Sequence, residues 1–347
     1  MAVPAYRQAN RVAVLRIEGE IDKITLDSLE RRVRKAKADG VDAVVLDINT
    51  PGGDMLATLD INHLIRTECP ANTVAWVNPM AFSAGTIISL NCREIVVAPG
   101  ATFGDAAPIY LMPLAGLISL PATERAKVEA PLLSEIVSAA RRNHYDENLV
   151  RAFVSVGVEL WLIENVQTGD RVFVDRVEYK TIFDEDPPAT ITSSSLMQGK
   201  IVKPWYSSYL ESGDRAGSPQ SPADIEKQIQ DLQSLPARAS LTAADRGQWK
   251  LIAQVDSADQ LLTVKADEAL YFGLARAEIA NDAQLKGYFG AQELRRYDPM
   301  WSEGLVRLLV SWPIRLILIA VFLIALFLEL ATPGVGVFGA TAAVALL

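Results

Sequence analysis

Residues 44–53 read VVLDINTPGG, a buried strand followed by the turn that ends it. The largely apolar run Val41–Ile48 predicts a strand. Pro51-Gly52-Gly53 then predicts a tight turn, and a helix at about Met55–Thr67 follows it. A strand, a turn and a helix in this order are the repeating unit of a parallel sheet.

The same alternation extends on both sides of this unit. A strand is predicted at Val12–Ile17, followed by a helix whose apolar residues recur at helical spacing until Gly40 ends it. Further strands are predicted at Val74–Val77 and Ile95–Ala98, with a short helix through Leu90 between them. We therefore predict an α/β fold with a parallel sheet, in which functional sites form beyond the carboxyl ends of the strands.

The middle of the chain departs from this alternation. Short β-type runs at Leu160–Ile163 and Arg171–Val174 flank a Thr168-Gly169-Asp170 turn, which predicts an inserted β-hairpin. Pro, Ser, Gly and Asp dominate residues 184–240, a composition that predicts an exposed linker.

A membrane anchor is predicted near the C-terminus. Ile314–Ala331 is almost wholly apolar, with Arg315 and Glu329 near its ends, and is long enough to cross a hydrocarbon core of about 30 Å. A second apolar stretch, Val335–Leu347, follows a Thr332-Pro333-Gly334 break, and we expect further membrane helices beyond it. The alternative, a buried hairpin of a soluble core, fits this density of Leu, Ile and Phe less well.

The predicted organisation has five parts. The α/β fold resumes near Trp249, with a helix at Ala266–Tyr271 and a last strand near Ala277–Ile279. The parts are a first segment of the α/β domain at 10–155, a β-hairpin insertion and flexible linker at 156–248, a closing segment of the α/β domain at 249–290, a juxtamembrane linker at 291–311 and a transmembrane region at 312–347.

Charge and residue counts exclude several classes of function. The net charge of −9 and the pI of about 5.0 leave no basic surface for a phosphate backbone, so no nucleic-acid partner is expected. Cys69 and Cys92 form no paired motif, and His63 and His144 have no ligand pattern around them, so no metal site is expected. The chain contains no Gly-Lys-Ser/Thr phosphate loop, and we expect no cofactor.

Two strand-to-helix turns carry residue types suited to acyl transfer. Pro51-Gly52-Gly53 would present backbone N–H groups at the start of a helix, where developing negative charge is favoured. Ser83 follows a strand and is succeeded by small residues that leave room for a substrate carbonyl, as in the nucleophile elbow of hydrolases. Each turn has an ordinary alternative: the glycines could serve tight geometry alone, and Ser83 could simply cap the next helix.

Together the two turns resemble the ClpP-like serine peptidase superfamily, which includes signal-peptide peptidase A and the membrane-bound NfeD-type proteases. The strand and Gly-Gly turn at 44–53, the Ser83-Ala84-Gly85 motif and the APGATFG stretch at 98–104 carry this resemblance. The NfeD-type branch is further suggested by ADEA at 266–269, GLA at 273–275 and ELATPG at 329–334.

This resemblance implies a ClpP/crotonase-like fold and a set of roles for the two turns. Ser83 would attack a peptide carbonyl, and the N–H groups of Gly52 or Gly53 and of Ala84 would form the oxyanion hole. The substrates would be hydrophobic peptide segments, such as the C-terminal tails of stomatin-like membrane proteins.

The base is also taken from the resemblance. A ClpP-type triad would need a histidine about twenty-five residues after the serine, where this chain has Pro108. The NfeD-type branch resembles a Ser-Lys dyad, and Lys127 stands at the corresponding place before an apolar helix. An amine among apolar atoms gives up its proton more readily, which suits this role. The nearby charges of Glu124, Arg125 and Glu129 leave open the alternative of a solvated surface lysine.

The predicted function is a membrane-anchored, ATP-independent serine endopeptidase of the ClpP class. Two alternatives stay open: a catalytically inactive ClpP-fold membrane scaffold, and a crotonase-type acyl-CoA enzyme in which two N–H groups polarise a thioester without a serine. The expected partners are a peptide or membrane-protein substrate, membrane lipid and further copies of the chain in a homo-oligomer.

Two indications disagree about the side of the membrane on which the catalytic domain lies. Arg295, Arg296, Arg307 and Arg315 precede the hydrophobic helix and favour a cytoplasmic catalytic domain under the positive-inside rule. The resemblance implies the extracytoplasmic, periplasmic side instead. We expect the periplasmic side and a signal segment removed from this chain, because its first residues hold no apolar run of signal-peptide length.

Overall fold

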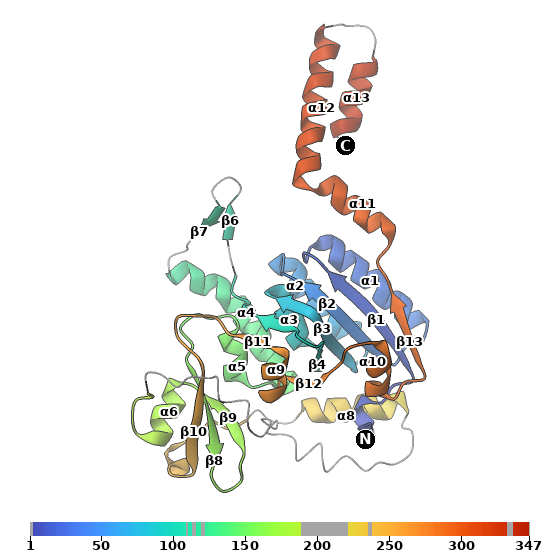
Figure 1. Ribbon diagram of the computed structural model, residues 1–347. Coiled ribbons are helices and arrows are strands. Elements are labelled where there is room, and N and C mark those ends of the chain that lie inside the picture. The colour runs from blue at the N-terminus through green and yellow to red at the C-terminus, as the bar shows by residue number, and fades with distance from the viewer. Residues whose placement is uncertain are drawn as a thin grey trace. The chain divides into compact units, whose positions relative to one another are not determined.

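The computed structural model describes residues 3–108, 110–112, 116–118, 122–188, 221–234, 238–331 and 336–346 (Figure 1). The chain divides into two compact units, Met1–Asp298 and Pro299–Leu347. The catalytic residues proposed from the sequence all lie in the first unit, and the apolar helix lies in the second.

An eight-stranded sheet forms the centre of the first unit. Its strands are β1 (Arg11–Glu18), β2 (Ala43–Thr50), β3 (Thr73–Phe82), β4 (Glu94–Val97), β5 (Thr102–Gly104), β11 (Thr263–Lys265), β12 (Ala275–Glu278) and β13 (Glu293–Tyr297). They are arranged in the order β11-β5-β3-β2-β1-β13, while β4 pairs with both β3 and β12. Every pair is parallel except β5 with β11, so the predicted α/β class with a parallel sheet is confirmed.

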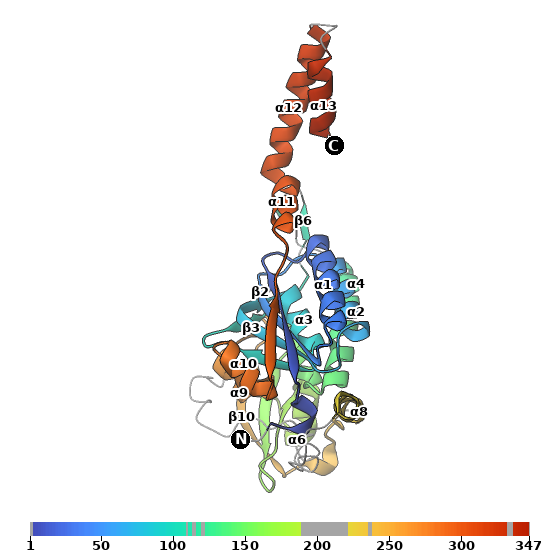
Figure 2. The same ribbon diagram turned by 90° about the vertical axis from the view of Figure 1, so that its right-hand side faces the viewer.

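Helices cover both faces of this sheet (Figure 2). They are α1 (Lys23–Ala38), α2 (Met55–Thr67), α3 (Ala84–Asn91), α4 (Ala122–Asn143), α5 (Glu147–Ala152), α9 (Ala266–Tyr271) and α10 (Asp282–Phe289). Alternation along β1 divides the core: Leu15 and Ile17 pack in the cluster that contains α1 to α4, whereas Val12 and Val14 pack with Leu285 on α10. The sheet is therefore buried on both faces, as its apolar strands require.

A smaller antiparallel sheet accompanies the main one. Its strands β8 (Leu160–Asn165) and β9 (Arg171–Val174) form the predicted hairpin, and α6 (Arg176–Phe183) follows them. The third strand, β10 (Trp249–Asp256), pairs with β8, although the sequence reading assigned it to the closing segment of the main domain. The short hairpin of β6 (Tyr110–Met112) and β7 (Gly116–Ile118) completes the strands of the described residues.

Residues predicted as linker include a helix. α8 (Pro222–Gln233) has Ile225 and Ile229 buried, so its apolar face packs against the rest of the unit. Two 3-10 turns, η1 (Ala5–Arg7) and η3 (Ala243–Asp245), are also present. The remainder of the predicted linker, 189–220 and 235–237, lies outside the described residues.

The expectation of a last strand near Ala277–Ile279 is wrong, because β13 follows it in the chain and pairs with β1. The residues of β13 read ELRRY, and at an edge of the sheet charged side chains face water on the open side. Such a strand lacks the apolar run that marks a buried one. The residues counted as juxtamembrane linker from 291 therefore begin with a strand of the main sheet.

The described residues of the second unit form the helices α11 (Trp301–Val310), α12 (Trp312–Ala331) and α13 (Val337–Leu346). In the part of the chain that the structure describes, α12 is the one helix long and apolar enough to cross a membrane. Glu329 near its end accepts a hydrogen bond of 2.9 Å from the N–H of Gly339 in the first turn of α13. The Thr332-Pro333-Gly334 break falls outside the described residues.

Candidate active site

Ser83 occupies a strained turn between β3 and α3. Its φ of 50° and ψ of −115° are angles that residues with a side chain rarely adopt. Its N–H donates to the carbonyl oxygens of Gly104 at 3.2 Å and Asp105 at 3.0 Å, and these bonds hold the conformation. A strained strand-to-helix turn of this kind raises a nucleophile above the end of a sheet.

The Ser83 side chain is not used as a helix cap. Ser83 is the N-cap residue of α3, yet its hydroxyl makes no capping hydrogen bond. Among the described residues no group is hydrogen-bonded to its Oγ, and the residue is half-buried. The capping alternative is therefore wrong for this serine, and its hydroxyl is available for another role.

Gly52 brings the Gly-Gly turn against this serine. A Cβ atom at position 52 would lie 2.6 Å from the Cβ of Ser83 and 3.1 Å from its Oγ, so no larger residue fits there. The φ of Gly52, +121°, also belongs to a region that favours glycine. The two turns singled out in the sequence therefore meet at one point of the structure.

Of the two glycine N–H groups in the Gly-Gly turn, one is already hydrogen-bonded and, in the described part of the chain, the other is not. The N–H of Gly52 donates to the hydroxyl of Thr50 at 3.1 Å and is occupied. Ile21 and Gly53 form a parallel bridge, in which the N–H of Ile21 donates to the carbonyl of Gly52 and the N–H of Asp54 donates to the carbonyl of Ile21. The N–H of Gly53 takes no part in this bridge and points away from Ile21. Gly53 is exposed, and no acceptor for its N–H occurs among the described residues.

A second donor stands beside Ser83 itself. Ala84 is the first residue of α3, where backbone N–H groups have no acceptor within the helix. The positive end of the helix dipole adds to the attraction for negative charge. Of the three residues predicted for an oxyanion hole, Gly53 and Ala84 thus retain N–H groups that are candidate donors. The N–H of Gly52 is already bonded, and the role of Gly52 is to let the Gly-Gly turn approach Ser83 closely.

Two buried threonines support the turns, and sequence reasoning missed both. Thr86 donates to the carbonyl of Ala81 at 2.6 Å and accepts from the N–H of Gly104 at 2.9 Å. Thr50 donates to the carbonyl of Gly19 at 2.6 Å while it accepts from Gly52. The available signal was their position: each lies within three residues of a motif, where a hydroxyl can bond the backbone of a turn.

Thr50 also touches the serine turn. A Cβ atom at Gly85 would lie 2.5 Å from the Cγ2 of Thr50, so the methyl group of this threonine packs against the backbone that follows Ser83. Its hydroxyl holds the Gly-Gly turn and its methyl group contacts the serine turn. One side chain therefore sets the spacing of the two.

A distant segment completes the Ser83 turn from the other side. Strand β11 pairs with β5, and the carbonyl of Leu262 accepts a hydrogen bond of 3.0 Å from the N–H of Asp105. A Cβ atom at Gly104 would lie 2.4 Å from that carbonyl oxygen, so only glycine permits the approach. Asp105, at a φ of 42°, acts here through its backbone.

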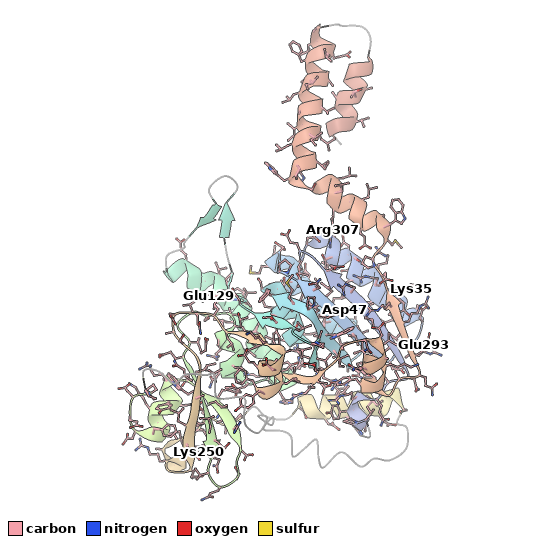
Figure 3. All side chains as sticks on the ribbon, in the orientation of Figure 1. Lys35, Asp47, Glu129, Lys250, Glu293 and Arg307 are labelled. Atoms are coloured by element: carbon pink, nitrogen blue, oxygen red, sulfur yellow. The ribbon has the colours of Figure 1, made fainter. Side chains whose placement is uncertain are left out.

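Lys127 lies on α4 with an exposed side chain. The positions one, two and three turns further along the helix, Pro131, Ser134 and Ser138, are exposed as well, whereas Leu132 and Ile136 face the core. Glu129, one of the charges expected to crowd the lysine, lies on the same helix (Figure 3). Its carboxylate accepts a hydrogen bond from Ser155 at 3.4 Å. No hydrogen bond or ion pair joins Lys127 to Ser83 within the described part of the chain.

A cavity of about 580 Å³ lies apart from these turns. Charged groups of both signs line it, among them Arg141, Asp146, Glu178 and Arg238. Burial raises the pKa of the Asp146 carboxyl to about 6, although Arg238 and two backbone N–H groups oppose the shift. None of its lining residues belongs to the Ser83 turn or the Gly-Gly turn.

Comparison with known proteins gives a family match over residues 11–171, to the family described as NfeD1b, N-terminal domain. Membrane protein NfeD1b of Bacillus subtilis (strain 168) is 37% identical over 103 residues, which are 30% of this chain and 23% of that protein. Membrane-bound protease PH1510 of Pyrococcus horikoshii is 28% identical over 164 residues, 46% of this chain and 36% of that protein. The alignments thus span roughly a quarter to a third of these two curated relatives.

Solved structures are similar as well. A lysine-to-alanine mutant of the 1510-N membrane-bound stomatin-specific protease, in complex with a substrate peptide, aligns with 86% of this chain and 97% of its own. Its TM-score is 0.47 and its identity 17%. A serine-to-alanine mutant of the same protease aligns over 42% of this chain and 70% of its own, with a TM-score of 0.38 and 28% identity.

Proposed function

We propose that this chain is a membrane-anchored serine endopeptidase. Its residues 11–171 match the NfeD1b N-terminal domain, and this match confirms the resemblance to the NfeD-type membrane proteases. The observation that carries the proposal is Ser83, held at a positive φ with an uncapped hydroxyl against Gly52. A serine that only ended a strand would need neither this strain nor this contact.

The proposed reaction is acyl transfer to Ser83. Its Oγ attacks the carbonyl carbon of a peptide bond, and the oxygen that becomes negative accepts hydrogen bonds from the N–H groups of Gly53 and Ala84. Collapse of this intermediate breaks the C–N bond, and the leaving amine takes the proton that Ser83 lost. Water then attacks the acyl-enzyme and regenerates the hydroxyl. No nucleotide enters these steps.

Lys127 is proposed as the group that carries this proton. Its side chain is exposed on α4, so another surface has room to cover it. A bound hydrophobic substrate or a neighbouring copy of the chain in a homo-oligomer could supply that cover. The dyad is therefore proposed as an arrangement completed on binding.

The proposed substrate is a hydrophobic peptide segment of a membrane protein. PH1510 is a membrane-bound protease, and 1510-N is a membrane-bound protease specific for stomatin. By this likeness we propose stomatin-like membrane proteins as substrates here. α12 would hold the enzyme at the bilayer in which such substrates reside, with the catalytic domain on the periplasmic side.

Fluorophosphonate labelling separates this proposal from its rivals. These probes phosphonylate an activated serine, so the full chain in detergent should gain one adduct at Ser83. A catalytically inactive scaffold would remain unlabelled. A crotonase-type enzyme would also remain unlabelled, and it would bind coenzyme A thioesters, which this chain should not.

Thr50→Val should lower kcat by about 10²-fold with KM nearly unchanged, because loss of the hydroxyl frees the Gly-Gly turn while the shape of the side chain is kept. Thr50→Ser keeps the hydroxyl and should retain most activity. Steady-state cleavage of a hydrophobic peptide measures both, at a temperature where circular dichroism shows each variant folded. Equal kcat for the valine variant and the unchanged chain would refute the role of Thr50.

Removal of Pro299–Leu347 should release the catalytic unit from membranes. The first unit has its own sheet and core, and α12 lies wholly in the removed part. After expression and ultracentrifugation, the full chain is expected in the membrane pellet and the shortened chain in the supernatant. Recovery of the full chain in the supernatant without detergent would contradict the anchor.

A further inference from the structure

Helix α11 has the reverse of the exposure pattern of a helix in a water-soluble protein. Its apolar side chains are the exposed ones: Trp301 is 83% exposed and Leu308 55%. Ser302, Glu303 and Arg307, its polar residues, are only half-exposed. An apolar surface left open in this way marks a contact with a partner or a membrane.

Four of the exposed apolar residues described in α11 form one face, and Val306, which is 44% exposed, lies next to it. Trp301, Leu305, Leu308 and Leu309 recur at spacings of four, three and one, which places them along one side of a helix. Glu303 and Arg307 are four residues apart and line another side, and Figure 3 labels Arg307 on this helix. We call the first set the apolar face of α11.

α11 is not a continuation of the membrane-spanning helix. Ser311 between them is extended, with φ −64° and ψ 144°, so the helical hydrogen bonds stop there. Pro313 stands in the first turn of α12. A helix tolerates proline in its first turn, where the missing N–H would have no acceptor, whereas a proline inside one continuous helix would break it. The two helices therefore have separate axes, and α11 is free to lie at an angle to α12.

We propose that α11 is an interfacial helix that lies in the headgroup layer of the bilayer, with its apolar face toward the acyl chains. The inference rests on the membrane anchoring included in the proposed function. α12 starts two residues after α11 ends, so a chain anchored by α12 holds α11 at the membrane surface. Trp301 and Trp312 supply the amphipathic rings that favour this depth, and Arg307 supplies a cation for lipid phosphates.

Lipid fits this face better than a second copy of the chain. A paired helix would bury its apolar face against protein and leave the headgroup layer, whereas ten residues next to a spanning helix already have lipid beside them. Charged residues on the other side remain in contact with water and phosphates. The occupant is thus argued from continuity with α12.

Fluorescence of a probe attached at single cysteines tests the proposal in the full chain. Leu305→Cys and Leu308→Cys sample the apolar face, and Glu303→Cys is the matched control on the polar side. The native thiols give little background: Cys92 is fully buried, and burial raises the pKa of the Cys69 thiol to about 12, which keeps it protonated and slow to react. The unsubstituted chain measures what background remains.

Each labelled variant is reconstituted in vesicles of phosphatidylcholine and phosphatidylglycerol and recovered by flotation. At 305 and 308 an environment-sensitive probe should emit at shorter wavelength, be quenched several-fold less by aqueous iodide than at 303, and be quenched by lipids that carry a nitroxide near the headgroup. If the protein floats with the vesicles but iodide quenches the probe equally at all three positions, the interfacial helix is refuted and the membrane anchor is not.

Two other outcomes also count against the proposal. Protection at 305 and 308 that disappears when the ratio of lipid to protein is raised would identify a second copy as the occupant. Failure of every variant to float with vesicles would overturn the membrane anchor, and the interfacial helix with it. Labelling at Leu309→Cys provides a further position on the apolar face if one of the first two variants does not fold.

Discussion

Ser83→Ala is expected to abolish peptide hydrolysis, with kcat lowered by roughly 10⁶-fold, and to remove all fluorophosphonate labelling. The reason is that no other hydroxyl described near the Gly-Gly turn is unbonded: those of Thr50 and Thr86 are both engaged with backbone groups. The fold should persist, because the strained backbone at Ser83 is held by its N–H bonds to Gly104 and Asp105, which alanine keeps.

Ser234→Ala is the matched control for this substitution. Its hydroxyl is exposed and bonds only a carbonyl in its own helix turn, so activity and labelling should stay at the level of the unchanged chain. Mass spectrometry of the labelled peptide identifies the modified residue, and circular dichroism verifies the fold. Hydrolysis by the Ser83 variant at the unchanged rate would remove the peptidase assignment from this site.

Lys127→Ala is expected to lower kcat by roughly 10²–10⁴-fold, the range for loss of a general base. The double variant with Ser83→Ala should be little worse than Ser83→Ala alone, because residues that act as one unit are not additive. Lys227→Ala, on an exposed position of α8, removes the same charge elsewhere and should leave the rate unchanged.

Lys127→Arg distinguishes a base from a surface charge. Arginine keeps the charge and the length but stays protonated, so it cannot take the proton from Ser83. We expect this variant to be as inactive as the alanine variant in single-turnover measurements of acylation. An active Lys127→Arg enzyme would assign the proton transfer to another group.

The part of the fold that sequence predicted best is the part in which local pattern and tertiary context agree. The strand before the Gly-Gly turn and the helix Met55–Thr67 were predicted to within a few residues, since a buried run and a helical period leave little ambiguity. β13 was missed because an edge strand carries charges. β10 was not predicted as a strand, and its residues were assigned to the closing segment of the main domain, because its pairing with β8 depends on a partner far away in the chain.

The same distinction applies to the candidate site. Ser83 and the Gly-Gly turn could be chosen from their residue types, and their contact could be expected because both turns follow strands of one parallel sheet. The roles of Thr50 and Thr86 were missed: their positions beside the motifs were a signal, but the backbone groups that they bond come together only in the folded turns. Lys127 lies at an exposed position of α4, and its role as the base stays a prediction that the Lys127 variants test.

The pairing of β11 with β5 has a consequence for the order of synthesis. Ser83 and Gly52 leave the ribosome early, but the carbonyl of Leu262 that fixes the turn after Gly104 is made much later in the chain. Contacts between segments so far apart in sequence form late in folding, because a long loop must be closed first. A nascent chain would therefore carry Ser83 in an unfinished turn until nearly the whole first unit has been made. Under the proposed function, this chain order would delay peptide cleavage until synthesis of that unit is almost complete.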